Sequence, residues 1–257
     1  MAAPDATTLY VGDSAGGNVA KSINNGWGWT AANTKPTGST GNINTIIVAD
    51  SVVVVGDTVG AVFRSTDAGS TWAQVGTATA GWANMFVQMD GDTLYATTSG
   101  NGLIYRYVLG VSTAWDQIGR ATGSVFVAPA VPPTVASGLA LAPDGTLYEA
   151  VNTPAAANQQ VARSINPTEA LPTPDAYFEY MTGLTAVATT AISVAELGSG
   201  NEVAIIQGAL GTVAAFVRVF SDTLSLGTSG PILVSPATKT DPVARPIWSQ
   251  AVLMRQS

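Results

Sequence analysis

Short apolar runs of strand length recur along the whole chain, and turns rich in Gly, Asp, Asn, Ser and Pro separate them. The longest such clusters, for example the four valines at 52–55, have the length of a single strand. The segments between them show no helical period, and frequent Thr and Val suit strands rather than solvated helices. The pattern therefore predicts an all-β chain.

One arrangement of strands occurs five times: an apolar strand, a turn, and a second strand with a basic residue near its end. The second strands are 18–22, 61–65, 103–107, 160–164 and 215–219. Their basic residues, which lie 42 to 57 residues apart, are Lys21, Arg64, Arg106, Arg163 and Arg218. A period of roughly 40–55 residues is typical of a propeller blade of four strands.

The other strands of each unit repeat as well. Thr-Leu-Tyr stands at 8–10, 93–95 and 146–148, and we place 53–55 and 203–205 in the same slot. Hairpin signals precede two of them, at 90–92 and 143–145. Leading strands are expected at 44–48, 85–89, 139–141 and 190–194, and fourth strands at 71–75 and 114–118. These units predict a single β-propeller domain, 1–257, with about five four-stranded antiparallel blades, at 1–42, 43–82, 83–124, 125–187 and 188–230.

The two ends of the chain suggest how the ring closes. The first unit lacks its leading strand, whereas 231–257 follows the last unit and contains the spare apolar segment 247–254. We expect 247–254 to pair beside 8–12, because such pairing removes an exposed strand edge. The alternative is that this chain is a slice of a longer repeat array.

Residues 65–72 read Ser-Thr-Asp-Ala-Gly-Ser-Thr-Trp, and 22–29 contain a decayed copy with Asn24 in place of the Asp. This motif resembles the Asp-box, Ser-x-Asp-x-Gly-x-Thr-Trp, of bacterial-neuraminidase-type repeats; 107–115 is a more degraded version. The resemblance implies an outer hairpin that holds the fold rather than a catalytic site. An Asp can accept hydrogen bonds from the turn backbone, and Gly can take a positive φ. The residues to which it assigns structural roles are Ser65, Asp67, Gly69, Trp72, Asn24, Gly26 and Trp29.

Proteins with such repeats include sialidases, other glycoside hydrolases, sortilin-type receptors, photosystem II assembly factors and bacterial surface proteins. The resemblance therefore supports a fold more strongly than it supports any activity. Sialidases are disfavoured here, because four of the arginines recur at one repeat position instead of forming a carboxylate clamp. The Arg-Ile-Pro signature that opens sialidase domains is also missing.

Charge and missing residue types narrow the functions. The net charge is −7, with ten basic residues scattered over the chain, which argues against binding nucleic acid or anionic membranes. No apolar run is long enough to span a bilayer. The chain contains neither His nor Cys, so histidine-based acid–base catalysis, thiolate nucleophiles and most transition-metal sites are excluded. We expect no metal and no cofactor; the pair of aspartates at 90 and 92 fits a hairpin better than a calcium loop.

These exclusions favour a non-catalytic module for binding or recognition, with a glycan as the expected ligand. Trp27 and Trp82 lie outside the Asp-box Trp position and could stack on sugar rings, and Glu179 stands between aromatic residues. Each has a structural explanation too: turn packing, packing between blades, and an exposed strand carboxylate. Two alternatives stay open. One is a surface-layer protein or one that adsorbs to solid, ice-like lattices; the other is an Asp-box glycoside hydrolase, since two carboxylates suffice for that chemistry.

The composition is typical of secreted and cell-surface proteins. Few charged residues, abundant Thr and Gly, and no Cys suit such an exterior. The first residues have neither the basic nor the apolar region of a signal peptide. We therefore expect an extracellular or surface location, with this chain as a mature or truncated form.

Overall fold

The computed structural model describes residues 1–30, 34–78, 81–99, 102–119, 136–151, 161–164, 167–168, 179–180, 189–197, 202–210 and 215–223. Regular structure in these ranges is entirely β. No helix among them is long and apolar enough to cross a membrane. Part of the fourth unit and the end of the chain, including the expected closing strand 247–254, lie outside the described residues.

The strands form five antiparallel sheets, which we number blades 1 to 5 in chain order. Blade 1 contains β1 (Leu9–Gly12) and β2 (Val19–Ser22). Blade 2 contains β3 (Ile43–Ala49), β4 (Val52–Asp57), β5 (Val62–Ser65) and β6 (Ala73–Gln74), and blade 3 contains β7 (Met85–Asp90), β8 (Thr93–Thr98), β9 (Ile104–Val108) and β10 (Asp116–Gly119). Blade 4 contains β11 (Ala136–Leu141), β12 (Leu147–Val151), β13 (Val161–Ser164) and β14 (Glu179–Tyr180), and blade 5 contains β15 (Thr189–Leu197), β16 (Glu202–Leu210) and β17 (Ala215–Thr223).

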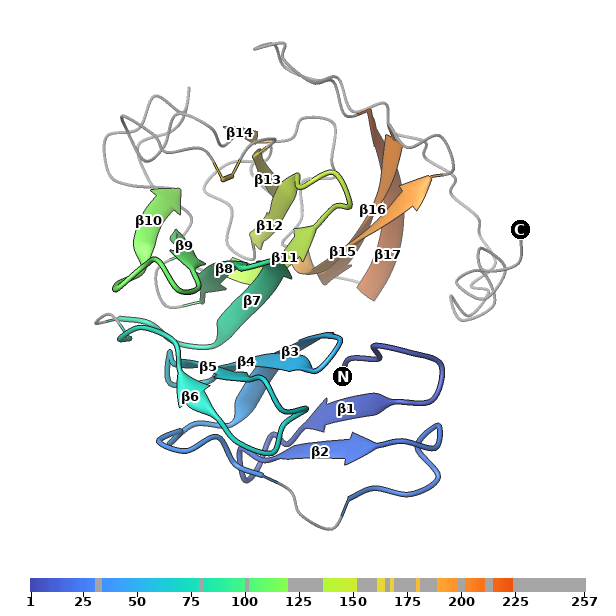
Figure 1. Ribbon diagram of the computed structural model, residues 1–257. Coiled ribbons are helices and arrows are strands. Elements are labelled where there is room, and N and C mark those ends of the chain that lie inside the picture. The colour runs from blue at the N-terminus through green and yellow to red at the C-terminus, as the bar shows by residue number, and fades with distance from the viewer. Residues whose placement is uncertain are drawn as a thin grey trace.

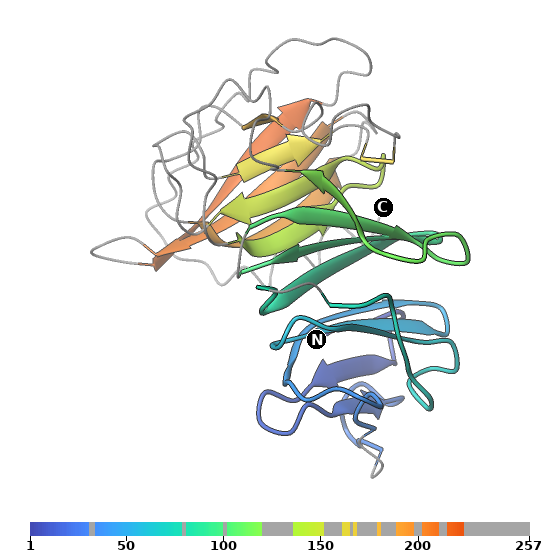
Figure 2. The ribbon, with the colours of Figure 1, turned by 90° about the vertical axis from the view of Figure 1, so that its left-hand side faces the viewer.

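Each blade is a meander in which neighbouring strands pair in chain order. The leading strands β3, β7, β11 and β15 contact one another in succession, and β1 contacts β3. The blades consequently follow one another in an arc (Figure 1) and stack face against face from β1–β2 towards β15–β17 (Figure 2). This is the all-β, propeller-type architecture that the repeat predicts.

Strand register repeats as the sequence does. In each of the five sheets, the basic residue pairs with a residue of the strand before its own. The basic strand is β2 in the two-stranded first sheet and the third strand in the other four. The pairs are Tyr10–Lys21, Val54–Arg64, Tyr95–Arg106, Tyr148–Arg163 and Gln207–Arg218.

The slot expected at 53–55 is therefore wrong by one residue, and the one at 203–205 is wrong by two. Val54 and Gln207 hold the place that the third residue of Thr-Leu-Tyr holds elsewhere. The loops between second and third strands differ in length, so equal spacing in the sequence does not give equal register.

The core lies between blades. On β4, Val53 and Val55 pack with Tyr10 and Phe63 against blade 1, whereas Val54 packs towards blade 3. Both faces of this strand are buried, which explains why it reads as a continuous run of valines instead of an alternating one. A third cluster, which includes Tyr95, joins blade 3 to blade 4.

The blades approach closely at one small residue. A Cβ added to Gly56 on β4 would lie 2.8 Å from both the Cβ and the carbonyl oxygen of Met85 on β7. No side chain fits at that separation. Glycine thus permits the leading strand of blade 3 to lie against blade 2.

The outer side of β1 bears on the closing scheme. The Ala2 N–H donates to the Tyr10 carbonyl at 2.9 Å, and the Tyr10 N–H donates to the Ala2 carbonyl at 2.8 Å. The N-terminal segment thus occupies part of the edge at which 247–254 was expected to pair. A closing strand there would have to displace Ala2 or pair farther along β1.

Candidate functional site

Two grooves lie between neighbouring blades at repeat-related positions. The Lys21 groove, about 310 Å³, is lined by Tyr10, Lys21 and Thr34 of blade 1 and by residues 68–70 of blade 2. The Arg64 groove, about 390 Å³, is lined chiefly by Arg64, Thr71, Trp72 and Gln74 of blade 2 and by Tyr107 and Leu109 of blade 3. Each combines the basic residue of one blade with the turn that follows the third strand of the next.

The turn at 65–72 is held by a serine and an aspartate. The Ser65 hydroxyl donates to Asp67 at 2.7 Å and accepts the Gly69 N–H at 2.8 Å. Thr71 donates its backbone N–H and its hydroxyl to Asp67, at 2.8 and 2.6 Å. Ala68 and Gly69 both have positive φ, at 57° and 90°, a conformation that the glycine accepts without strain. The hydrogen bonds from Thr71 and Ser65 lower the pKa of Asp67 to about 2.

The turn at 22–29 repeats this geometry without the charge. The Ser22 hydroxyl donates to Asn24 Oδ1 at 3.0 Å and accepts the Gly26 N–H at 2.9 Å. The Gly28 N–H donates to the same Asn24 oxygen at 2.7 Å. Asn25 and Gly26 have φ values of 59° and 84°. The decayed copy therefore keeps the fold of the turn, because an amide oxygen accepts the same backbone bond as a carboxylate oxygen.

The carbonyl groups of the turn at 65–72 accept hydrogen bonds from the preceding blade. Ala68 and Gly69 lie four and five residues after Arg64. The Tyr10 hydroxyl of blade 1 donates to the Ala68 carbonyl at 3.4 Å, and the Thr34 hydroxyl donates to the Gly69 carbonyl at 2.5 Å. The Trp72 indole N–H in turn donates to Thr34 Oγ1 at 3.3 Å. The turn thus joins blade 2 to blade 1.

Arg106 makes the same kind of connection between blades 3 and 4. Its Nη1 donates to the carbonyls of Pro167 and Thr168, at 3.3 and 2.6 Å. These two residues lie four and five positions after Arg163, the basic residue of blade 4. The paired carbonyls of the next blade's turn are therefore the acceptors at both interfaces.

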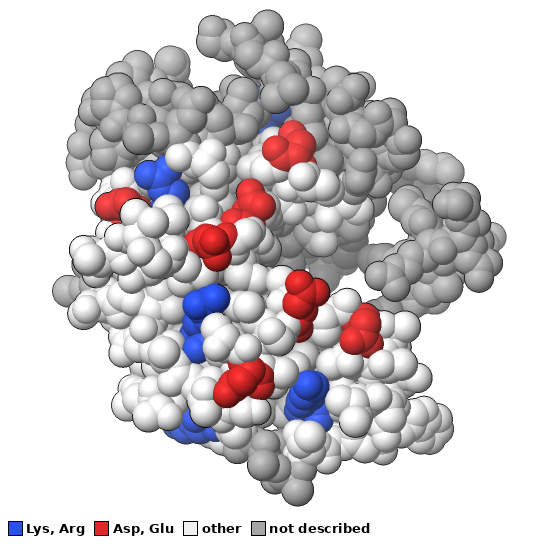
Figure 3. All heavy atoms as spheres, in the orientation of Figure 1, with Lys and Arg blue, Asp and Glu red and all other residues white. Residues whose placement is uncertain are grey.

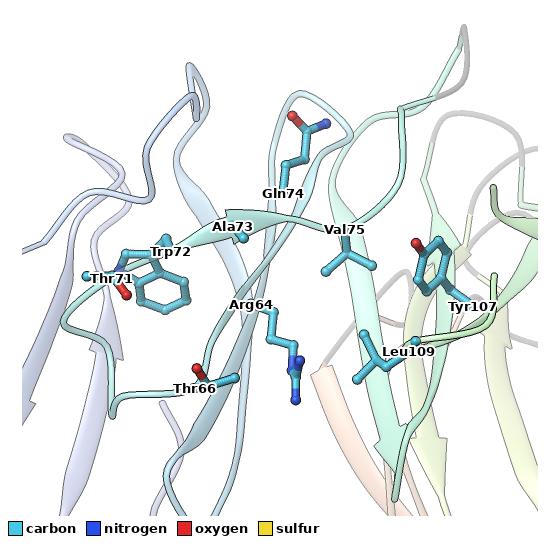
Figure 4. Close-up of a pocket in the computed structure, with 10 residues that line it drawn as sticks. Arg64, Thr66, Thr71, Trp72, Ala73, Gln74, Val75, Tyr107 and Leu109 are labelled. Carbon is cyan, nitrogen blue, oxygen red and sulfur yellow. The ribbon is translucent and has the colours of Figure 1, made fainter. Parts of the chain in front are cut away.

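Arg64 differs from Arg106. Its side chain makes no hydrogen bond or ion pair with the described residues, and its Nε is buried without a partner. Figure 4 shows the guanidinium directed into the groove, between Thr66 and Leu109. None of the described side chains that line this groove is acidic. An unpaired guanidinium in such a place is able to bind an oxygen-rich or anionic ligand.

The wall of the groove on blade 3 is an aromatic cluster. Tyr107 lies beside Trp115, with ring centroids 5.3 Å apart, and the Trp115 indole N–H donates to the Val75 carbonyl of blade 2 at 3.0 Å. Trp82 completes the cluster, 4.5 Å from Tyr105 and 5.9 Å from Trp115. Of these rings, Tyr107 lines the groove, and the others pack behind it.

The predicted binding residues are scattered. Trp27 is 90% exposed beside the first turn, whereas Trp82 is 6% exposed and its ring lies inside the interface between blades 2 and 3. A buried ring offers no face to a sugar, so Trp27 is the accessible member of the pair. Glu179 lies on β14, where its backbone pairs with Arg163 of β13. Neither Trp27 nor Trp82 lines either groove.

Sequence reasoning did not single out Arg64, because it treated the repeated arginines as strand residues facing solvent or another blade. The available signal was the residue after the basic one. It is Ser in blades 1, 2 and 4 but Tyr107 in blade 3. In blades 2 and 4 the turn after this serine accepts hydrogen bonds from the preceding blade. That difference marks the turn that leaves Arg64 unpaired.

Carboxylates elsewhere do not form a site. Glu149 is fully buried on β12, where Thr97 of blade 3 donates to it at 2.7 Å, so a substrate cannot reach it. In the described ranges no three acidic side chains cluster as metal ligands. On the face shown in Figure 3, charged residues are scattered over a mostly uncharged surface.

Comparison with solved structures places this architecture among the β-propellers. YCF48 from Cyanidioschyzon merolae matches with a TM-score of 0.58 at 12% identity, over 90% of this chain and 67% of that one. YCF48 bound to D1 peptide matches with 0.56 at 14%, over 86% and 63%. The GH74 xyloglucanase from Xanthomonas campestris matches with 0.59 at 16%, over 91% and 37%.

Such low identities establish the fold and no activity. The chain spans between about a third and two thirds of the length of these propellers. No family model matches the chain, and no curated protein matches it in sequence.

Proposed function

We propose that this chain is a non-catalytic recognition module that binds a glycan in the Arg64 groove. The observation that carries the proposal is the unpaired guanidinium of Arg64 in a groove of about 390 Å³ between Trp72 on one side and Tyr107 on the other. Aromatic rings, threonine hydroxyls, an amide and one charge are the groups that hold a sugar ring by its apolar face and its hydroxyls.

The same proposal assigns the two serine-containing turns to the Asp-box class. The shared hydrogen bonds of Asp67 and Asn24 support this, since each oxygen holds the residue before the terminal Trp of its motif. In this assignment the turns stabilise the blades and shape the grooves. We propose a location outside the cell or on its surface, where glycans are accessible.

A catalytic role is less well supported than binding. A glycosidase needs two carboxylates on either side of a bond. The described residues that line the Arg64 groove include none, and Glu149 is buried at another interface. The folds shared with GH74 enzymes and YCF48 are compatible with either role, and the chemistry of the groove supports binding.

A glycan array that includes insoluble polysaccharides tests the proposal. Saturable binding that weakens about tenfold or more in Arg64→Ala, as expected for a lost charged hydrogen bond, would support it. Trp27→Ala is the matched comparison, because Trp27 is exposed outside the groove; weakening there alone would move the site to Trp27. Hydrolysis of the bound glycan would contradict a non-catalytic role. No binding at any concentration would contradict glycan recognition and favour the alternative of a self-assembling or adsorbing surface protein.

A further inference from the structure

We propose that the glycan of the Arg64 groove is acidic, with a sugar carboxylate bound to the Arg64 guanidinium; this rests on the proposed function and names its ligand class. The argument starts from the molecule's own use of the same position. Arg64 and Arg106 are repeat equivalents, each paired in register with the second strand of its blade. Arg106 holds two oxygens, the carbonyls of Pro167 and Thr168. The position therefore presents a guanidinium to paired oxygen acceptors.

The turn of blade 3 supplies no such acceptors to Arg64. In blades 1, 2 and 4 the strand that carries the basic residue (β2, β5 and β13) ends one residue after it, whereas β9 continues for two residues, to Val108. The following turn closes on itself: the N–H groups of Val111 and Ser112 both donate to the Val108 carbonyl, at 3.2 and 2.8 Å. Ser112 Oγ accepts the Val108 N–H at 3.0 Å. The place that backbone oxygens occupy beside Arg106 is thus left to a ligand beside Arg64.

A carboxylate suits that place best. A guanidinium binds its two coplanar oxygens through parallel hydrogen bonds, and charge assistance makes these bonds stronger than those to a hydroxyl. Asp67, the acidic residue of the adjacent turn, is already engaged by Ser65 and Thr71 and does not line the groove. An incoming carboxylate therefore meets one unpaired cation and no carboxylate among the described residues that line the groove.

The remaining walls favour a sugar over a peptide terminus as the carrier of that carboxylate. Trp72 and Tyr107 offer ring surface, and Thr66, Thr71 and Gln74 add neutral polar groups. An extended peptide would require a row of backbone partners, as at an open strand edge. On this side of blade 2 the backbone of β5 is already paired with β6, and the outermost strand β6 is only two residues long, too short an edge for such a row.

The test uses three probes of equal length: oligogalacturonate, its methyl ester, and a neutral galactose oligomer. Calorimetric titration of the full chain is expected to show acid binding about tenfold to a hundredfold tighter than the ester, as for a charged hydrogen bond. Added salt should weaken the binding of the acid and leave the binding of the ester unchanged. Arg64→Gln should remove the preference for the acid, and Arg64→Lys should retain part of it.

Lys21→Gln is the matched control, because it removes the same charge at the equivalent position of blade 1. It should leave the acid preference intact; an equal loss would show a general charge effect and overturn the inference. Equal binding of acid and ester, unaffected by Arg64→Gln, would overturn the acidic ligand while leaving glycan binding standing. Failure of all three probes, with binding of a peptide that ends in a free carboxylate, would overturn both. Should Arg64→Gln fail to fold, a wild-type preference for the ester would be decisive against the inference.

Discussion

Blade 3 meets its two neighbours in different ways. Towards blade 4, Arg106 reaches across the interface and is held by the carbonyls of Pro167 and Thr168. Towards blade 2, Arg64 occupies the equivalent position and makes no bond to the turn that faces it. The same residue type at the same repeat position closes one interface and leaves a groove at the other.

The difference originates in the turn, not in the arginine. A serine after the basic residue ends the strand and forms the turn that points its carbonyls at the preceding blade, as seen for blade 2. Tyr107 in blade 3 cannot make the serine's bonds; the strand continues and its ring becomes a wall of the groove. A repeat protein can thus open a groove between two blades where one structural contact is missing.

Replacing each arginine separately should separate the two interfaces by the largest margin. Arg106→Ala should lower the free energy of unfolding by about 2 kcal/mol, because it removes charged hydrogen bonds and leaves two carbonyls without their donor. Arg64→Ala should change it by less than about 0.5 kcal/mol, as for a side chain with no partner. Urea denaturation of the two variants checks this; equal losses would mean that Arg64 also joins blades.

The aromatic cluster beside the open groove should contribute less to the free energy of unfolding. Trp115→Phe removes the indole bond to the Val75 carbonyl while keeping an aromatic ring, and should cost about 1 kcal/mol of unfolding free energy. Trp27→Phe, at a ring that is 90% exposed, provides the neutral comparison. Thermal melts of both variants measure the effect. A Trp115→Phe protein as stable as wild type would show that ring packing alone holds this wall.

The closed interface contains a buried phenol hydroxyl. Tyr95 pairs with Arg106 across the strands of blade 3, and the Tyr95 hydroxyl is buried without a partner among the described residues. At the open interface the equivalent residue, paired with Arg64, is Val54. Tyr95→Phe should therefore raise the unfolding free energy by up to about 1 kcal/mol.

The pH dependence of the same variant gives a second measure. Burial and the nearby Asp90 raise the pKa of Tyr95 to about 12 from 10.0, so the folded state prefers the neutral phenol. Wild-type stability should fall as the pH rises from about 10 towards 12, because the unfolded chain ionises first. Tyr95→Phe should show a flatter decline over this range, and an unchanged decline would contradict the prediction.

The smallest expected effect is a difference between the turns at 65–72 and 22–29 in how protein stability depends on acidic pH. The folded pKa of Asp67, about 2, lies below its ordinary 3.8, so its contribution to stability is present above about pH 4 and is lost as the pH falls towards 2. Asp67→Asn should flatten the dependence of the melting temperature on pH in this range. Asn24→Asp should steepen it, because the first turn has the same geometry. No change in slope in either variant would show that the turns unfold before the blades.

Much of the fold could be predicted from local signals. Apolar runs gave the strands β3, β7 and β10 to within a few residues, and Gly91 and Gly145, both with positive φ, lie at the predicted hairpins. Register was predicted less well: Val54 instead of Val55 stands opposite Arg64, because loop length does not appear in a strand pattern. The Arg64 groove was not predicted, because its walls come from two blades that are distant in the sequence. Trp82 is buried and Trp27 is exposed, and their similar sequence surroundings gave no indication of either.

The sequence by itself determined the strand pattern, the five-fold repeat and the two serine-containing turns, since each depends on residues within a few positions of one another. It also excluded every chemistry that needs His or Cys. The tertiary structure decided which arginine is satisfied and which is free. That depends on where the next blade places its turn, roughly 40–60 residues away along the chain, and a shift of one residue at the end of β9 is enough to turn a contact into a groove.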